Sequence, residues 1–226
     1  MPAADPDAFN VDVDPATRVS ALLTRPADAR GACVLAHGAG AGMTHPFMQA
    51  LVDGLAQRRI ATLRCQFPFM QRGSKRTDPP ALAQAAVRAA VIAAAQRLDG
   101  LALFAGGKSF GARMTSQAQA VAPLPAVRGL VFVGFPLHPA DRPSDERARH
   151  LSEVRVPMLF LQGTRDKLAQ PALIQALVDR LGAPARLEWL EHADHGFEVL
   201  VRSGTTAERI LAELLDRAAA WMREYA

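Results

Sequence analysis

The chain has 226 residues, of which 50% are hydrophobic and 21% charged, and its formal net charge is +4. This is ordinary globular composition at a length that suits one domain with a large buried core. The excess basic residues are scattered and only one tyrosine is present, which argues against the clustered basic face of a nucleic-acid-binding protein. We therefore expect a single domain over residues 1–226 with no nucleic-acid partner.

Two further features of the composition concern compartment and redox state. The N-terminal residues MPAADPDAFNVDVDP include acidic residues and no apolar core, unlike a signal peptide. The most apolar segment, residues 81–98, is interrupted by glutamine and arginine, so no membrane-spanning segment is expected. Cys33 and Cys65 are far apart and lack metal-ligand spacing, which is typical of reduced core cysteines. The sequence predicts a cytoplasmic protein that does not associate with a membrane.

Short apolar strands alternate with amphipathic helices along the chain, a pattern typical of a mostly parallel sheet with helices on both faces. In such sheets ligands bind at the carboxyl ends of the strands. Residues 9–24 alternate weakly and could form one or two edge strands, and residues 136–156 form a polar connection. The remaining strands are expected at 32–36, 60–63, 101–105, 129–134, 157–161 and 187–190, and the helices at 46–58, 79–98, from 110 onward, 171–181 and 206–225. Asp78 is expected to cap the second helix with Pro79 as its first residue, and Thr205-Thr206-Ala207-Glu208 resembles a capping box at the last one.

The segment Leu103 to Arg113, LFAGGKSFGAR, has two incompatible interpretations. Gly-Lys-Ser is the end of a phosphate-binding P-loop, but the first glycine of that motif would be residue 102, which is Ala102 inside a predicted strand. Gly107-Lys108-Ser109-Phe110-Gly111 is also a Gly-x-Ser-x-Gly turn, which presents a nucleophilic serine between a strand and a helix. Gly107 and Gly111 would let the two elements approach closely, and Lys108 would be incidental. The strand before it and the helix after it favour the second interpretation.

A serine nucleophile needs a base, and the base needs a carboxylate to orient it. In folds with this turn the partners follow in the order serine, acid, histidine. Asp166 comes shortly after the strand at 157–161, and His195 follows the last strand, so both are placed to reach Ser109. His192 is the competing histidine. Asp194 is the competing acid, but adjacent residues rarely face one another well, and a role in stabilising the loop suits it better.

Acyl transfer also requires amide donors for the developing oxyanion. The amide of Phe110, directly after the serine, is one candidate. The other is the amide of Ala39 in the turn His37-Gly38-Ala39-Gly40-Ala41-Gly42. A dinucleotide-binding loop is the alternative for this turn, but its glycines are not spaced as Gly-x-Gly-x-x-Gly, and the next strand ends in Arg64-Cys65-Gln66 without an acidic residue for a ribose.

Together, the segments HGAGAGMTHPFM, CQFPFMQRGSKRTDPP, GGKSFGARM, LQGTRD and ADHGF resemble the α/β-hydrolase superfamily from about residue 20 to residue 224. The chain is most similar to the small lidless branch of dienelactone-hydrolase-like proteins, and within it to predicted bacterial hydrolases related to testis-expressed proteins and NSL-complex subunits. The resemblance implies an α/β-hydrolase fold with roughly eight strands and no cap domain. It also implies a Ser109–His195–Asp166 triad with oxyanion donors at Ala39 and Phe110. Dienelactone hydrolases proper have a cysteine nucleophile, so their substrate does not carry over.

The sequence thus predicts a serine hydrolase of carboxylesterase type that acts on a small-molecule acyl substrate and needs no metal or organic cofactor. Only about twenty residues separate the strands near 133 and 157, so the site is expected to be open. Two alternatives remain, namely a catalytically silent binding or scaffold module and an acyltransferase. The acyl group, the leaving group and the oligomeric state do not follow from the sequence.

Overall fold

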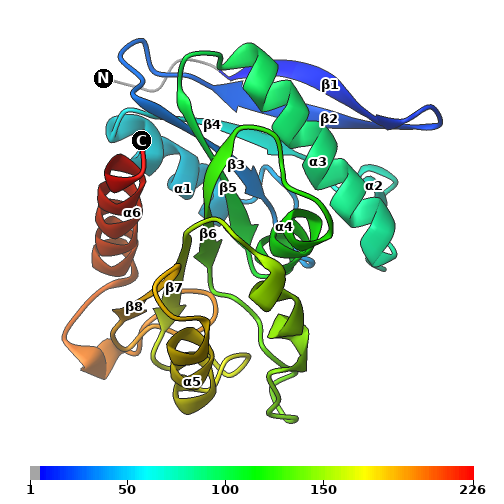
Figure 1. Cartoon of the computed structure of the whole chain (residues 1–226). Helices are drawn as coiled ribbons and strands as arrows, with labels where there is room; N and C mark the ends of the chain where they lie inside the picture. Colours follow the sequence, from blue (N-terminus) through cyan, green and yellow to red (C-terminus); the bar gives the residue numbers. More distant parts are fainter. Residues whose placement is uncertain (1–5) are drawn as a thin grey trace.

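One eight-stranded sheet organises the part of the chain that this computed structural model describes, residues 6–226 (Figure 1). The strand order is β1-β2-β4-β3-β5-β6-β7-β8. The pairs β1–β2 and β2–β4 are antiparallel, and all the others are parallel. The strands are β1 (Asp7–Asp14), β2 (Thr17–Thr24), β3 (Gly31–Ala36), β4 (Ile60–Cys65), β5 (Ala102–Lys108), β6 (Val127–Val133), β7 (Met158–Gly163) and β8 (Ala185–Leu190). This confirms the predicted mostly parallel α/β-hydrolase sheet.

Helices cover both faces of the sheet. On one face α1 and α6 lie next to each other, and on the other face α3, α4 and α5 follow one another (Figure 1). The helices are α1 (Pro46–Gln57), α2 (Pro68–Gln71), α3 (Pro80–Arg97), α4 (Phe110–Val121), α5 (Pro171–Leu181) and α6 (Ala207–Glu224), with short 3₁₀ segments η1 (Glu146–Glu153) and η2 (Val201–Ser203). The termination of α5 follows the prediction, because Gly182 caps it with a positive φ of 70°.

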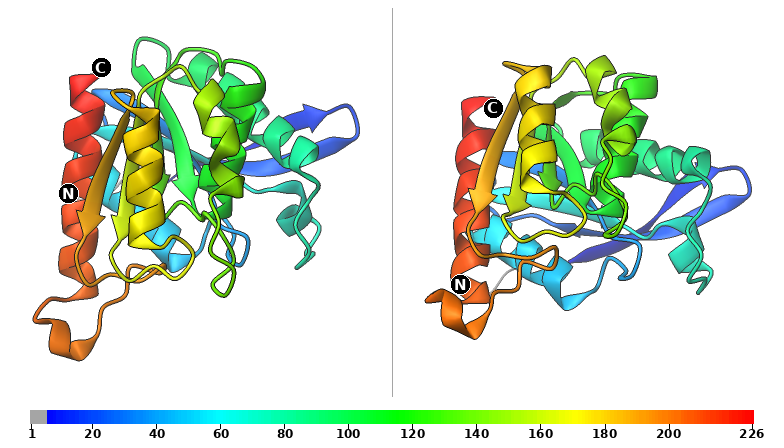
Figure 2. Two further views of the ribbon diagram at one scale, coloured as in Figure 1. Left: turned by 60° about the horizontal axis from the view of Figure 1, so that its bottom comes forward. Right: turned by 90° about the horizontal axis from the view of Figure 1, so that it is seen from below.

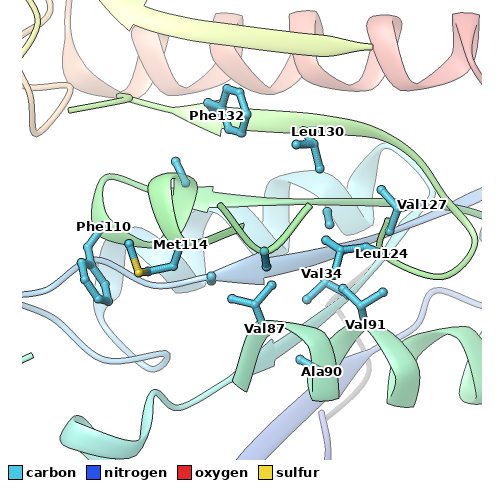
Figure 3. Close-up of a cluster of buried hydrophobic side chains, with 14 of the residues drawn as sticks. Val34, Val87, Ala90, Val91, Phe110, Met114, Leu124, Val127, Leu130 and Phe132 are labelled. Atoms are coloured by element: carbon cyan, nitrogen blue, oxygen red, sulfur yellow. The ribbon is translucent and has the colours of Figure 1, made fainter. Parts of the chain in front are cut away.

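Because the central strands are buried on both faces, their side chains divide alternately between two cores. In β7, Phe160 belongs to the core beneath α3, α4 and α5, and its neighbours Leu159 and Leu161 belong to the core beneath α1 and α6. Figure 3 shows the first core, where Val87 and Val91 of α3 face Val34 of β3. Both cysteines are buried in the sheet, and burial raises the pKa of each thiol to about 12.

Residues 67–80 and the starts of two helices differ from the prediction. The prolines of residues 67–80 predict a loop, but this segment contains the short helix α2. Pro79, and not Asp78, caps α3, so that Pro80 becomes its first residue. The Asp78 carboxylate instead accepts a hydrogen bond from the Phe69 amide at 2.7 Å and pairs with Arg72. The cap of α6 lies one residue later than the capping-box pattern suggested, at Thr206.

The loops at the carboxyl ends of the parallel strands gather at one edge of the sheet (Figure 2). Between β6 and β7 the described chain forms only a connection with η1, so no cap domain is inserted there. Among the helices of residues 6–226, none is both long and apolar enough to cross a bilayer.

Candidate active site

Ser109 lies on the sharp turn between β5 and α4, where its backbone conformation is unusual. It is the residue immediately before α4, with φ 53° and ψ −112°. A positive φ is uncommon for a residue with a side chain and costs of the order of 1–3 kcal/mol, so it persists only where the surroundings enforce it. The Ser109 amide donates to the Val133 carbonyl at 3.1 Å, which holds the turn against β6. The side chain is partly exposed, as a nucleophile must be.

Glycines allow this turn because backbone lies where their side chains would be. A Cβ on Gly107 would be 2.2 Å from the Ala36 carbonyl oxygen, and a Cβ on Gly111 would be 2.2 Å from the same atom. Gly106 is even more restricted, since its Cβ would be 1.8 Å from the Val131 carbonyl oxygen. The two glycines that the motif singled out are therefore required by close approach of β3 to the β5–α4 turn, and Gly106 is a third that the motif does not include.

The structure brings together the three side chains that the sequence predicted. His195 Nε2 lies 2.9 Å from Ser109 Oγ, and His195 Nδ1 lies 2.7 Å from Asp166 Oδ2. The Asp166 side chain is completely buried, and the His195 side chain is 26% exposed. A buried carboxylate beside Nδ1 favours the tautomer that carries its proton on Nδ1, which leaves Nε2 free to accept the serine proton.

Asp166 is held by more than the histidine. Gln162, fully buried at the end of β7, donates from Nε2 to Asp166 Oδ2 at 2.5 Å, and its Oε1 accepts from the Phe135 amide at 2.9 Å. The Leu168 amide donates to Asp166 Oδ1 at 2.8 Å. Each carboxylate oxygen thus has a protein donor, which compensates the cost of burying the charge. Gln162 is not among the predicted site residues, although a polar residue directly after an apolar strand run and four residues before the acid was a usable signal.

The competing residues near His195 have other roles. The Asp194 carboxylate accepts hydrogen bonds from the amides of Gly196 and Glu198 at 2.8 and 3.0 Å, as expected for a carboxylate that stabilises its own loop. His192 is exposed with a positive φ of 65°, and its amide and carbonyl bind Thr164 and Arg165. Neither residue lies between Ser109 and Asp166.

Lys108 differs from its expected role as a bystander. Its ammonium reaches the His195 loop and donates to the His195 carbonyl oxygen at 2.5 Å. Burial lowers the pKa of Lys108 to about 8, even though Asp166 and Asp194 act in the opposite direction. The sequence missed this contact because Lys108 and His195 are distant along the chain and no local pattern links them.

The predicted oxyanion loop, residues 37–42, lies beside the turn that carries Ser109. A Cβ on Gly38 would be 4.0 Å from Ser109 Cβ. The loop is anchored by His37, whose Nδ1 lies 2.7 Å from the Gly38 carbonyl oxygen and whose Nε2 accepts from the Phe67 amide at 2.9 Å. Burial lowers the pKa of His37, which is consistent with this neutral bridging role. Among the backbone hydrogen bonds of the turns and loops of residues 6–226, the amides of Ala39 and Phe110 donate to no carbonyl, as free oxyanion donors would require.

A second serine–histidine pair occurs on the far side of α4. Ser116 Oγ lies 2.8 Å from His150 Nε2 and also donates to the Arg113 carbonyl at 3.0 Å. Ser116 is completely buried, so its hydroxyl is closed to an acyl substrate. Burial, together with the nearby Arg113 charge, lowers the pKa of His150 to about 4. This pair connects α4 to η1. Across residues 6–226, no three His, Cys, Asp or Glu side chains are grouped as a metal site would need.

The fold and the site together define a class of α/β protein in which a serine on a strand-to-helix turn meets a histidine and a carboxylate from later loops. The sequence matches the alpha/beta hydrolase domain family over residues 29–223, and the chain belongs to this family. The family resemblance seen in the sequence is thereby confirmed.

Solved structures with the same fold include three bacterial proteins. Dienelactone hydrolase from Anabaena variabilis has a TM-score of 0.76 and 21% identity, with 98% of this chain and 99% of that chain covered. An alpha-beta serine hydrolase homologue from Coxiella burnetii has a TM-score of 0.75 and 19% identity over the whole of both chains. A serine hydrolase without a lid from Xanthomonas campestris has a TM-score of 0.74 and 18% identity, covering 96% and 95% of the two chains. At these identities the similarity establishes the fold.

Proposed function

We propose that this protein is a serine hydrolase that cleaves an ester or related acyl bond through an acyl-enzyme intermediate. One observation carries the proposal, namely the continuous hydrogen-bonded series from Ser109 Oγ through the His195 imidazole to buried Asp166. A serine hydroxyl is a weak nucleophile at neutral pH and becomes effective when such a base takes its proton. The similarity in fold to serine hydrolases supports the same reading.

In the acylation step, His195 Nε2 takes the Ser109 proton as Oγ attacks the substrate carbonyl carbon. The new C–O bond places negative charge on the carbonyl oxygen. Asp166, buried at 2.7 Å from Nδ1, holds the ring and stabilises the imidazolium. When the tetrahedral intermediate collapses, the bond to the leaving alkoxide breaks and that oxygen takes the proton from Nε2. Water then repeats the sequence on the acyl-enzyme and releases the carboxylic acid.

Two backbone amides are our candidates for stabilising the oxyanion. Phe110 is the first residue of α4, so its amide has no partner within the helix and lies at the positive end of the helix dipole. The Ala39 amide belongs to the loop that His37 and Gln66 anchor beside the turn. Fixed donors of this kind contribute about 3–4 kcal/mol each in hydrolases, because they need no reorganisation during the reaction.

The experiment combines covalent labelling with turnover. The wild-type protein is treated with a fluorophosphonate probe, and mass spectrometry locates the adduct. It is also assayed against p-nitrophenyl esters of increasing chain length. The Ser109→Ala variant should be unlabelled and inactive. Asp166→Asn should be labelled at least a hundredfold more slowly, since the wrong histidine tautomer would be favoured.

The outcomes separate the proposal from its alternatives. If the wild-type protein is not labelled at Ser109 while a known serine hydrolase in the same tube is, the proposal is wrong and a binding module is favoured. If labelling occurs but added alcohols intercept the acyl group faster than water does, the protein is an acyltransferase. The ester series would then identify the acyl length that the site accepts.

A further inference from the structure

Lys108 combines a half-buried position with a direct contact to the main chain of His195, the base of the proposed mechanism. It is the last residue of β5 and directly precedes Ser109. Its ammonium donates to the His195 carbonyl oxygen at 2.5 Å, 87 residues away in sequence, and lies 5.1 Å from the centre of the Phe197 ring. A long, flexible cation is seldom buried unless it has partners.

The chain around Lys108 leaves room for this arrangement. Gly134, at the end of β6, has a positive φ of 66°, and a Cβ there would be 2.9 Å from Lys108 Nζ and 3.6 Å from His195 Cε1. The ammonium and the imidazole edge therefore both lie close to the space that a side chain at residue 134 would occupy. The charged and titratable groups that face the ammonium are Asp166 from the loop after β7, and Asp194 and His195 from the loop after β8.

We infer that Lys108 is a positioning residue, which holds the His195 main chain while Ser109 engages the His195 ring, so that the alignment of the base depends on the lysine charge. This inference rests on the proposed serine-hydrolase function. The two contacts originate from adjacent residues, Lys108 at the end of β5 and Ser109 on the turn directly after it, at 2.5 Å to the His195 carbonyl and 2.9 Å to its Nε2. The segment that carries the nucleophile thus also fixes the position of the base relative to it.

The dependence on charge follows from the strength of the bond. A charge-assisted hydrogen bond is about twice as strong as a neutral one. Since burial brings the pKa of Lys108 to about 8, the ammonium loses its proton between about pH 7 and 9. Above this range a weaker amine–carbonyl bond remains, and the loop at residues 194–198 is held less firmly. Misplacement of a reacting group by 1 Å can cost about a hundredfold in rate.

The test compares Lys108→Met, Lys108→Arg and a matched control, Lys75→Met, in which the lysine is exposed in the loop after α2. The readouts are the fluorophosphonate labelling rate, kcat and KM between pH 6 and 10, and amide-exchange protection of residues 194–198. For the wild type and the control we expect a fall in kcat and in labelling centred near pH 8. For Lys108→Met we expect kcat to be at least tenfold lower with KM within twofold, no transition near pH 8, and reduced protection of 194–198.

Lys108→Arg keeps a permanent charge, so it tests the dependence on charge even if the methionine variant does not fold. In this variant the fall in kcat near pH 8 should be absent or should shift upward by more than one pH unit. The inference is overturned if Lys108→Met retains the wild-type rate and protection, or if Lys108→Arg retains the transition. Failure of the proposed function would appear separately, as a wild-type protein that is not labelled at Ser109.

Discussion

The start of α4 lies so close to the end of β3 that one added methyl group at Gly111 should carry a large penalty in stability. In Gly111→Ala the added Cβ would lie 2.2 Å from the Ala36 carbonyl oxygen, 2.5 Å from the Ala36 carbonyl carbon and 2.7 Å from the His37 carbonyl oxygen. Ordinary contacts start near 3.4 Å, so α4 and β3 must separate by about 1 Å. Overpacking typically costs 1–3 kcal/mol, and backbone atoms cannot rotate away as side chains can. We expect a loss of about 3 kcal/mol.

The matched control is Gly40→Ala, where a Cβ would meet nothing within 4 Å and φ is not positive. Its unfolding free energy should change by less than about 0.5 kcal/mol. Urea unfolding followed by circular dichroism measures both values. Thermal unfolding should show the Gly111→Ala midpoint about 6–12 °C below the wild type. If the two alanine variants are equally stable within 1 kcal/mol, close backbone approach is not the reason that glycine occupies position 111.

Three further results are expected. The free energy of unfolding of Ser109→Gly should be about 1–2 kcal/mol higher than that of Ser109→Ala, because glycine accepts the positive φ at residue 109 without strain. Equal stability of the two variants would show that the turn is unstrained. Gln162→Leu should lose about 2–4 kcal/mol of unfolding free energy and slow the labelling of Ser109, because it leaves the Phe135 amide without an acceptor and removes one of the two partners of Asp166 Oδ2. The exposed Gln175→Leu serves as its control, and a similar small effect in both would contradict the role of Gln162. Burial lowers the pKa of His150 to about 4 in the folded state, whereas the unfolded imidazole takes up a proton below about pH 6.5. The stability that neutral His150 contributes is therefore complete above pH 6.5 and is lost as the pH falls toward 4, at less than about 1.4 kcal/mol per pH unit. Urea unfolding of His150→Gln should show a shallower acid dependence than that of the wild type, and an identical slope would refute the assignment.

The parts of the fold that could be predicted are those in which local sequence dictates the backbone. Buried strands such as β3 and β6 appear as short apolar runs in the sequence. The turn from Gly107 to Gly111 can be recognised because the close approach of β3 requires glycine at fixed spacing. The grouping of Ser109, Asp166 and His195 followed from topology, since the carboxyl ends of parallel strands meet at one edge. Their catalytic roles stay predictions until the labelling experiment is done.

What escaped prediction depends on contacts between distant segments. The Asp78 carboxylate has the sequence context of a helix cap, but the Phe69 amide and Arg72 compete for it and determine its position. Lys108 lies inside a motif that is defined by its glycines and serine, and its partner is a main-chain carbonyl that no side-chain pattern encodes. Local propensity cannot show such choices, because they are decided by which donor is buried beside which acceptor.

The glycines of the turn also bear on how the nucleophile could be changed. Main-chain atoms of Ala36, His37 and Val131 fix the location of residue 109, and the side chain of that residue takes no part in supporting the turn. The fold therefore fixes the position of the reactive atom but does not require that this atom be oxygen. A thiol introduced as Ser109→Cys would occupy the same point above the same imidazole, which makes this turn a ready scaffold for exchanging oxygen chemistry for sulfur chemistry without rebuilding the fold.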